Sequence, residues 1–163
     1  MIEEEDLEKT IEDLLLQKIH FSLLPREENG WNLLRISHEA PSKKKFERNF
    51  RDKIRKEIGN RNGLYVYQDS KTHLPLYVGE GNIARRIESH YKESYLEPGN
   101  SKWIAFFNEH RVKMDVYWVE LEIDKSIRRF VERMLEKNLN PKFICYKFRR
   151  RKTTALTART KAK

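Results

Sequence analysis

Two side chains able to bind an anion and to move a proton lie close together near the middle of the chain. Arg86 and His90 are four residues apart in a segment over residues 82–95 whose apolar residues recur at helical spacing, so they share one face of a predicted helix. Asn82 is a good N-cap for it. An arginine guanidinium holds phosphate oxygens with a planar fork of donors, and a histidine titrates close to neutral pH. This face could therefore hold a phosphate and accept or relay a proton.

A predicted β-hairpin leads into this helix and carries two tyrosines, Tyr65 and Tyr77. Residues 63–67 and 74–79 are β-like runs joined by a short polar turn. Pro75 restricts the second run to a strand start or a sheet edge.

The order of these residues resembles the signature of the GIY-YIG endonuclease family. The matching residues are Gly63-Leu64-Tyr65, Tyr77-Val78-Gly79, Arg86 and His90. Leucine and valine stand where the family name has isoleucine, and both keep a branched aliphatic side chain in a strand. The resemblance covers roughly residues 60–148, and its specificity lies in the ordered set rather than in either tripeptide.

The resemblance also implies a metal ligand on the last predicted helix. Counting back from Pro141 places the family's glutamate at Glu132, with Glu136, one turn later, as the alternative. A carboxylate oxygen suits Mg²⁺ or Mn²⁺, and a single carboxylate implies one ion that keeps several waters. The structural alternative is a surface glutamate paired with a neighbouring arginine: Arg128, Arg129 or Arg133. The family often has an asparagine three residues after the proline, where this chain has Ile144, so one polar helper is missing.

Taken together, these features predict a metal-dependent endonuclease that acts on DNA. By resemblance, Tyr65 is the leading candidate for the general base, but a free tyrosine has a pKa of about 10 and must lose its proton near positive charge. His90 is the other candidate for accepting the proton. Tyr77 would orient water or phosphate, and Arg86 would hold the scissile phosphate. Two alternatives stay open: a nucleic-acid-binding protein with a degenerate site, whose tyrosines are ordinary strand aromatics, and an interaction protein that uses its N-terminal helix.

The charge of the chain favours a polyanionic partner. Its 163 residues carry a formal net charge of +9, with a pI near 9.6. Residues 1–40 hold ten acidic and four basic side chains, and the remainder holds fifteen and thirty, so the positive charge accompanies the motif. One cysteine, Cys145, cannot form an internal disulfide and suits a reducing compartment. No secretory signal or bilayer-spanning run is visible, so we expect a cytoplasmic protein.

Three basic segments are the predicted contacts to nucleic-acid phosphates. Residues 42–58 form a helix with one apolar face, closed by Gly59 as a C-cap. The predicted binding residues are Lys43, Lys44, Lys45, Arg48, Arg51 and Arg55 on this helix, Arg85 on the motif helix, and Arg149, Arg150, Arg151 and Lys152 in a tail. The tail, residues 149–163, holds seven basic side chains and no acid, so we expect it to be disordered when free. The structural alternative for the basic helix is a solvated charged face.

The fold class predicted from these elements is α/β (α+β), with helices around a small, three-stranded, largely antiparallel sheet. Residues 112–122 supply the third strand, and residues 31–36 could form a further short one. The predicted domains are an N-terminal extension over residues 1–59, a GIY-YIG-like nuclease domain over residues 60–148 and the basic tail. The extension begins with an acidic amphipathic helix over residues 3–20, whose apolar stripe must pack on the core or on a second copy in a homodimer.

Overall fold

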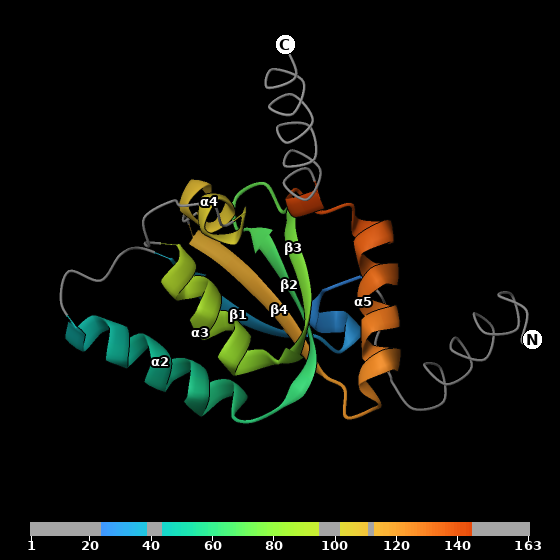
Figure 1. The fold of residues 1–163 in the computed structure, drawn as a ribbon, viewed down its shortest axis with the longest axis horizontal. Helices are drawn as coiled ribbons and strands as arrows, with labels where there is room; N and C mark the ends of the chain where they lie inside the picture. The colour runs from blue at the N-terminus through green and yellow to red at the C-terminus, as the bar shows by residue number, and fades with distance from the viewer. Residues whose placement is uncertain (1–23, 39–43, 95–101, 111–112, 145–163) are drawn as a thin grey trace, which may run out of the picture.

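The computed structural model describes residues 24–38, 44–94, 102–110 and 113–144. Its elements in chain order are a 3₁₀ turn η1 (Glu27–Asn29), β1 (Asn32–Ser37), α2 (Lys44–Ile58), β2 (Asn62–Asp69), β3 (Pro75–Asn82), α3 (Ile83–Glu93), α4 (Lys102–Glu109), β4 (Lys113–Glu120) and α5 (Lys125–Leu139) (Figure 1). No helix in these segments is long and apolar enough to cross a bilayer. The acidic helix predicted over residues 3–20, Cys145 and the basic tail lie outside the described residues.

Within the described residues the sheet has four strands in the order β1-β4-β2-β3, and every pairing is antiparallel. The mixed α+β class was predicted correctly, but the count of three strands was one too low. The extra strand is β1, which pairs with β4 from Asn32 opposite Trp118 to Ser37 opposite Lys113. The sequence signal for β1 is weak because Leu33 and Leu34 interrupt the alternation, and only every second residue of the strand is buried.

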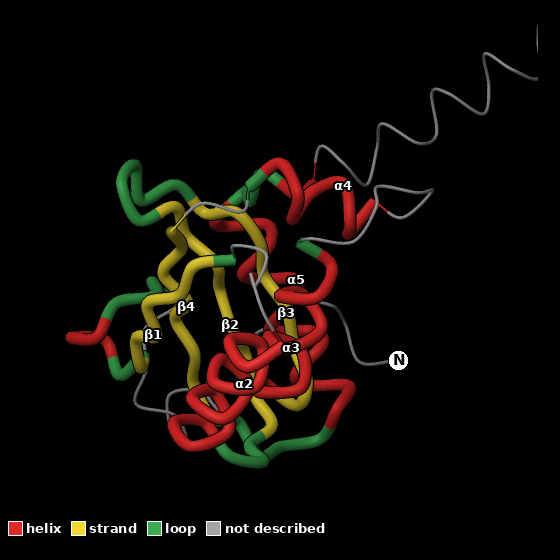
Figure 2. Tube along the Cα trace, turned by 90° about the vertical axis from the view of Figure 1, so that its left-hand side faces the viewer, coloured by secondary structure: helices red, strands yellow, loops and turns green. Residues whose placement is uncertain are grey.

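The two faces of the sheet are covered by different helices. Tyr65 and Tyr67 on β2 belong to a core cluster with residues of α2, α3 and α4, whereas Leu64 and Val66 belong to a second cluster with α5. Figures 1 and 2 show α2 and α3 on one side of the sheet and α5 on the other. The tyrosines of the motif therefore face α3, across the sheet from the body of α5.

Helix α2 is part of the same core as the strands that follow it. Ile54 and Ile58 are fully buried in the cluster that contains Tyr65, and Phe50 packs against it. Gly59 ends the helix with a φ of 67°, and its N–H donates to the carbonyl of Arg55, as the C-cap prediction requires. The extension thus contributes β1 to the sheet and α2 to the core.

The helix boundaries near the motif agree with the sequence signals. The side chain of Asn82 accepts a hydrogen bond from the N–H of Arg85 at 3.0 Å and caps α3. Asp124 caps α5, and Asn140 ends it in the left-handed conformation immediately before Pro141. Pro75 begins β3, which is an edge strand of the sheet.

Candidate functional site

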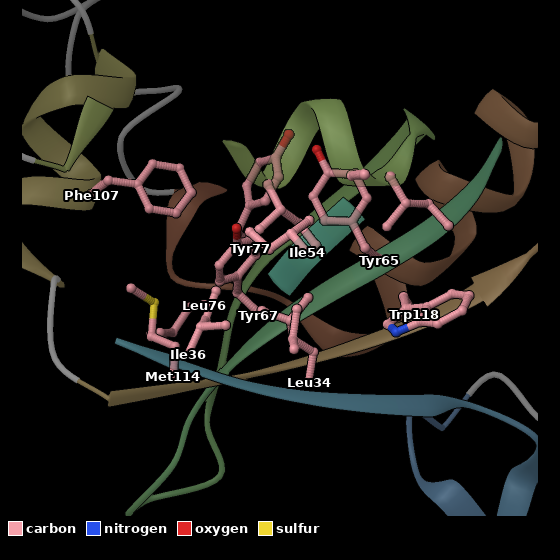
Figure 3. Close-up of a cluster of buried hydrophobic side chains, with 14 of the residues drawn as sticks. Leu34, Ile36, Ile54, Tyr65, Tyr67, Leu76, Tyr77, Phe107, Met114 and Trp118 are labelled. Carbon is pink, nitrogen blue, oxygen red and sulfur yellow. The ribbon is translucent and has the colours of Figure 1, made fainter. Parts of the chain in front are cut away.

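Tyr65 and Tyr77 share one face of the sheet because of the β2–β3 register. Tyr65 lies opposite Gly79, and Tyr67 lies opposite Tyr77, so the two motif tyrosines are diagonal neighbours with ring centroids 5.9 Å apart. Figure 3 shows both rings on the side of the sheet where α3 runs. A Cβ at position 79 would overlap the hydroxyl and ring of Tyr65, so Gly79 leaves the space that this ring occupies.

Helix α3 follows β3 directly and brings His90 onto Tyr65. The Tyr65 hydroxyl and Nε2 of His90 are 3.0 Å apart, and Nδ1 of His90 lies 2.8 Å from Oε2 of Glu93. A carboxylate can only accept a hydrogen bond, so Nδ1–H of a neutral ring donates to Glu93 and Nε2 is left as an acceptor. The Tyr65 hydroxyl therefore donates to Nε2, and the three side chains form a chain of hydrogen bonds.

Aromatic side chains of α4 hold the His90 ring in place. Phe107 and Trp103 both stack on it, with ring centroids 4.5 Å and 5.6 Å away and interplanar angles of 20° and 24°. Burial lowers the pKa of His90 below its usual value, and the hydrogen bond and charge of Glu93 act in the opposite direction. His90 is thus a neutral proton acceptor near neutral pH.

Both motif tyrosines keep their protons in this environment. Burial raises the pKa of Tyr65 well above its usual value, the neighbouring Tyr77 and Tyr67 raise it further, and the positive charge of Arg86 lowers it by less. Burial also raises the pKa of Tyr77, the charge of Glu132 raises it further, and the positive charge of Arg86 lowers it. Arg86 alone therefore does not turn Tyr65 into a tyrosinate, and a proton acceptor beside Tyr65 is needed if this hydroxyl is to act as a base.

Helix α5 packs on the face of the sheet opposite Tyr77. Because β3 is an edge strand, side chains of α5 can still lie near Tyr77 around that edge. Val131 and Leu135 are buried against the sheet, and the residues that follow each of them, Glu132 and Glu136, are half-buried. Both carboxylates raise the pKa of Tyr77, which means that their charges act on its hydroxyl. The two glutamates considered as metal ligands thus lie on the Tyr77 side of α5.

The donor set of this site fits a hard divalent cation. Mg²⁺ in proteins is commonly held by one or two carboxylates and several waters rather than by a full cage of side chains. Among the described residues, no group of three or more His, Cys, Asp or Glu side chains is arranged to hold a metal. Glu132, with Glu136 one turn away, would supply the one or two carboxylates of such a site. Arg128 and Arg129, two of the three arginines that the sequence offers as partners for Glu132, contact Glu80 at 3.4 and 3.6 Å.

The basic residues predicted to contact nucleic acid are placed unevenly. Arg51 and Arg55 both bind Glu88 of α3, at 3.3 and 2.7 Å, and Arg48, Arg55 and Arg85 are exposed. Lys43 and the tail residues Arg149, Arg150, Arg151 and Lys152 lie outside the described residues, as do the side chains of Lys44 and Lys45. The pairing of Arg51 and Arg55 fixes two of the predicted cations on the α3 side of α2.

Comparisons with protein-family models, with curated proteins and with solved structures find no match to this chain. The resemblance to the GIY-YIG family therefore depends on the motif residues of the sequence alone.

One member of the cluster, Glu93, was missed by reasoning from the sequence. Its signal was present, since an acidic residue three positions after a helical histidine lies on the same face and can bind its ring nitrogen. Pairs of this kind at i, i+3 are common on helix surfaces, so the spacing alone does not mark a site. Only the burial of His90, 3% exposed, distinguishes this pair from a surface pair.

Proposed function

We propose that the protein is a metal-dependent endonuclease that hydrolyses DNA phosphodiester bonds, the activity that its resemblance to the GIY-YIG family implies. The observation that carries the proposal is the convergence of Tyr65, Tyr77, His90 and Arg86 from β2, β3 and α3 at one sheet edge. Arg86 acts electrostatically on the other three, and Glu132 acts on Tyr77 from α5. This convergence is the arrangement expected if the ordered motif serves one reaction.

The hydrogen-bond chain supplies a route for the proton of the attacking water. As a water attacks phosphorus, its proton moves to the oxygen of Tyr65 while the Tyr65 proton moves to Nε2 of His90. The imidazolium that forms is stabilised by the Glu93 carboxylate at Nδ1. The logic is that of a Ser-His-Asp triad, with a tyrosine hydroxyl in place of the serine and water as the nucleophile. Tyr65 can then act as a base without first becoming a tyrosinate, despite its raised pKa.

Arg86 is the side chain suited to the phosphate. It is exposed, it passes over Gly81, and it lies one helical turn before His90. Its guanidinium can hold two phosphate oxygens at once and stabilise the charge that develops as the bond breaks. Glu132 would hold a Mg²⁺ or Mn²⁺ ion, with Glu136 as the neighbouring carboxylate, and a bound ion would neutralise charge on the phosphate and the leaving oxygen.

The test is a cleavage assay on supercoiled plasmid, single-stranded and branched DNA with Mg²⁺, Mn²⁺ or EDTA. The wild-type chain should cut at least one substrate only with metal. Glu132→Ala should lose cleavage and keep DNA binding, because it removes a carboxylate that is not expected to contact DNA. Glu136→Ala tests the alternative ligand, and cleavage lost only in that variant would move the ligand by one turn. DNA binding without cleavage under all of these conditions would favour the alternative, a nucleic-acid-binding protein with a degenerate site.

A further inference from the structure

A groove of about 850 Å³ lies between α2 and α3, and neither Tyr65 nor Tyr77 lines it. Its polar lining includes Arg51 and Arg55 from α2, Asn60 from the following turn, and Arg85, Ser89 and Lys92 from α3. The three α3 residues follow one another at spacings of four and three, so they form one exposed stripe along the helix. Four cations thus face the groove, together with one acid, Glu88.

Glu88 fixes the α2 wall of this groove rather than cancelling its charge. It is buried, it binds Arg55 through both carboxylate oxygens at 2.7 and 3.2 Å, and it accepts from Arg51 at 3.3 Å. One carboxylate opposite two guanidiniums leaves a net positive charge, and both arginines are held at the groove instead of moving freely in solvent. Prepositioned cations lose less side-chain entropy when they bind an anion.

A second groove of about 490 Å³ continues from the first toward the proposed catalytic arginine. The two grooves share Asn82, Arg85 and Ser89. The second also includes Arg86 and, on its far side, Lys125 and Arg128 at the start of α5, together with one acid, Glu80, which pairs with Arg128 at 3.4 Å. The two together form a basic track that runs from α2, past Arg86, to the N-terminal end of α5.

The lining of this track suits a phosphodiester backbone rather than the bases. The side chains along it are charged or polar, and Ala84 is the only apolar one in either groove within the described residues. Aromatic platforms, on which bases stack, are absent from both of these linings. Phosphate contacts position a nucleic acid without reading its sequence.

We infer that the α2–α3 groove and its continuation bind the DNA backbone on either side of the bond that is cut, independently of sequence. This inference rests on the proposed function, and it identifies α2, which lies outside the family resemblance, as part of the substrate site. The track predicts contacts from Lys92 and Lys125, two residues that the sequence did not single out.

The test compares two double variants with the same net charge. Lys92→Gln/Lys125→Gln removes one exposed lysine from each groove, whereas Lys53→Gln/Lys137→Gln removes two exposed lysines from α2 and α5 that line neither groove. Binding of the full-length chain to a short fluorescent DNA duplex is measured in EDTA over a range of salt concentrations. If each groove lysine neutralises one phosphate, the slope of log affinity against log salt becomes less steep by about 0.9 per lysine, and affinity at 0.1 M salt falls on the order of tenfold per lysine. The control should match the wild type.

Each outcome separates this inference from the proposed function. Equal slopes in the two double variants, or no salt-dependent binding by the wild-type chain, would overturn the groove as a substrate site. A less steep slope in the groove variant, in a protein that never cuts DNA with Mg²⁺ or Mn²⁺, would support the groove and reject the nuclease. Metal-dependent cleavage with an unchanged slope in the groove variant would support the nuclease and reject the groove as its DNA-binding surface.

Discussion

At the scale of single residues, the raised pKa of Tyr65 decides how the proposed site must work. A tyrosine that burial keeps protonated is a poor isolated base, yet it can pass a proton on when an acceptor is in contact with its hydroxyl. His90 is that acceptor, and Glu93 selects the tautomer in which Nε2 is free of hydrogen. Glu93 is therefore a positioning residue for the proposed reaction.

Replacing Glu93 with glutamine tests this role. Glu93→Gln keeps a side chain of the same shape but removes the charge that stabilises the His90 imidazolium, so we expect the maximal cleavage rate to fall on the order of 10²-fold. Glu93 also raises the pKa of His90, so its loss lowers that pKa further. Because His90 accepts a proton only when neutral, the acidic limb of the pH–rate profile should move to lower pH. The measurement is a single-turnover pH profile.

A matched control is Glu57→Gln, which removes an exposed acid from α2. It should leave both the plateau and the acidic limb unchanged. If Glu93→Gln lowered the rate with no movement of the limb, its role would be structural, and an unchanged profile would exclude it from the proton route.

The sequence predicted which residues meet in the site but not their protonation. Tyr65, Tyr77, Arg86 and His90 were assigned through the resemblance to the family motif, and strand register and helix period then determine where their side chains point. The pKa directions could not, because they arise from burial under α4 and from contacts between tyrosines on adjacent strands. Such desolvation depends on tertiary packing and leaves no local signal in the sequence.

At the scale of elements, the β2–β3 hairpin is where sequence and structure agree most closely. Its edge proline and the capped helix that follows are local signals, and both are found where the sequence places them, whereas β2 extends to Asp69 and β3 to Asn82, beyond the predicted runs. Strand β1 was harder to predict because its partner, β4, lies some eighty residues away in the chain. Long-range pairing of this kind depends on which edge of the sheet remains open, and no local pattern encodes that.

The two glycines of the motif, Gly63 and Gly79, differ in what an added side chain would meet, and a double-mutant cycle can distinguish the two cases. Gly79→Ala places a methyl group on the distal half of the Tyr65 side chain, whereas Gly63→Ala places one on the backbone carbonyl of Val119. Overpacking of this kind typically costs about 1–3 kcal/mol of unfolding free energy. In a Tyr65→Leu background the atoms that Gly79→Ala meets are absent, so its cost should fall close to zero, while the cost of Gly63→Ala should remain.

The measurement is chemical denaturation of the single and double variants, analysed as a double-mutant cycle. A coupling between positions 79 and 65 of at least about 1 kcal/mol is expected, with none between positions 63 and 65. Additive costs at positions 79 and 65 would show that the hairpin relaxes away from Tyr65. The explanation of Gly79 as space for that ring would then be wrong.

At the scale of the whole molecule, the aromatic core between the sheet and α2, α3 and α4 also contains a second histidine, His38. It is fully buried, and rings of Phe50, Tyr67, Tyr91 and Phe107 surround it. Among the described residues, neither of its ring nitrogens has a hydrogen-bond partner. Burial, helped by the nearby His90, lowers the pKa of His38 from 6.5 to about 3. The core therefore holds a neutral imidazole that can be protonated only at a cost to folding.

This cost predicts how stability depends on pH. In the unfolded chain the histidine takes up a proton as the pH falls through 6.5, whereas folded His38 stays neutral until about pH 3, so unfolding becomes progressively easier between these values. From pH 7 to pH 5 this one group should remove about 2 kcal/mol of unfolding free energy. His38→Leu should remove that part of the loss whatever its effect on stability at pH 7, since leucine does not titrate. Urea denaturation at the two pH values measures the difference.

The control is His73→Asn, which replaces an exposed histidine at a φ of 56° that asparagine tolerates, and it should keep the wild-type difference. An equal loss in His38→Leu and the wild type would show that His38 is not held neutral in the folded core.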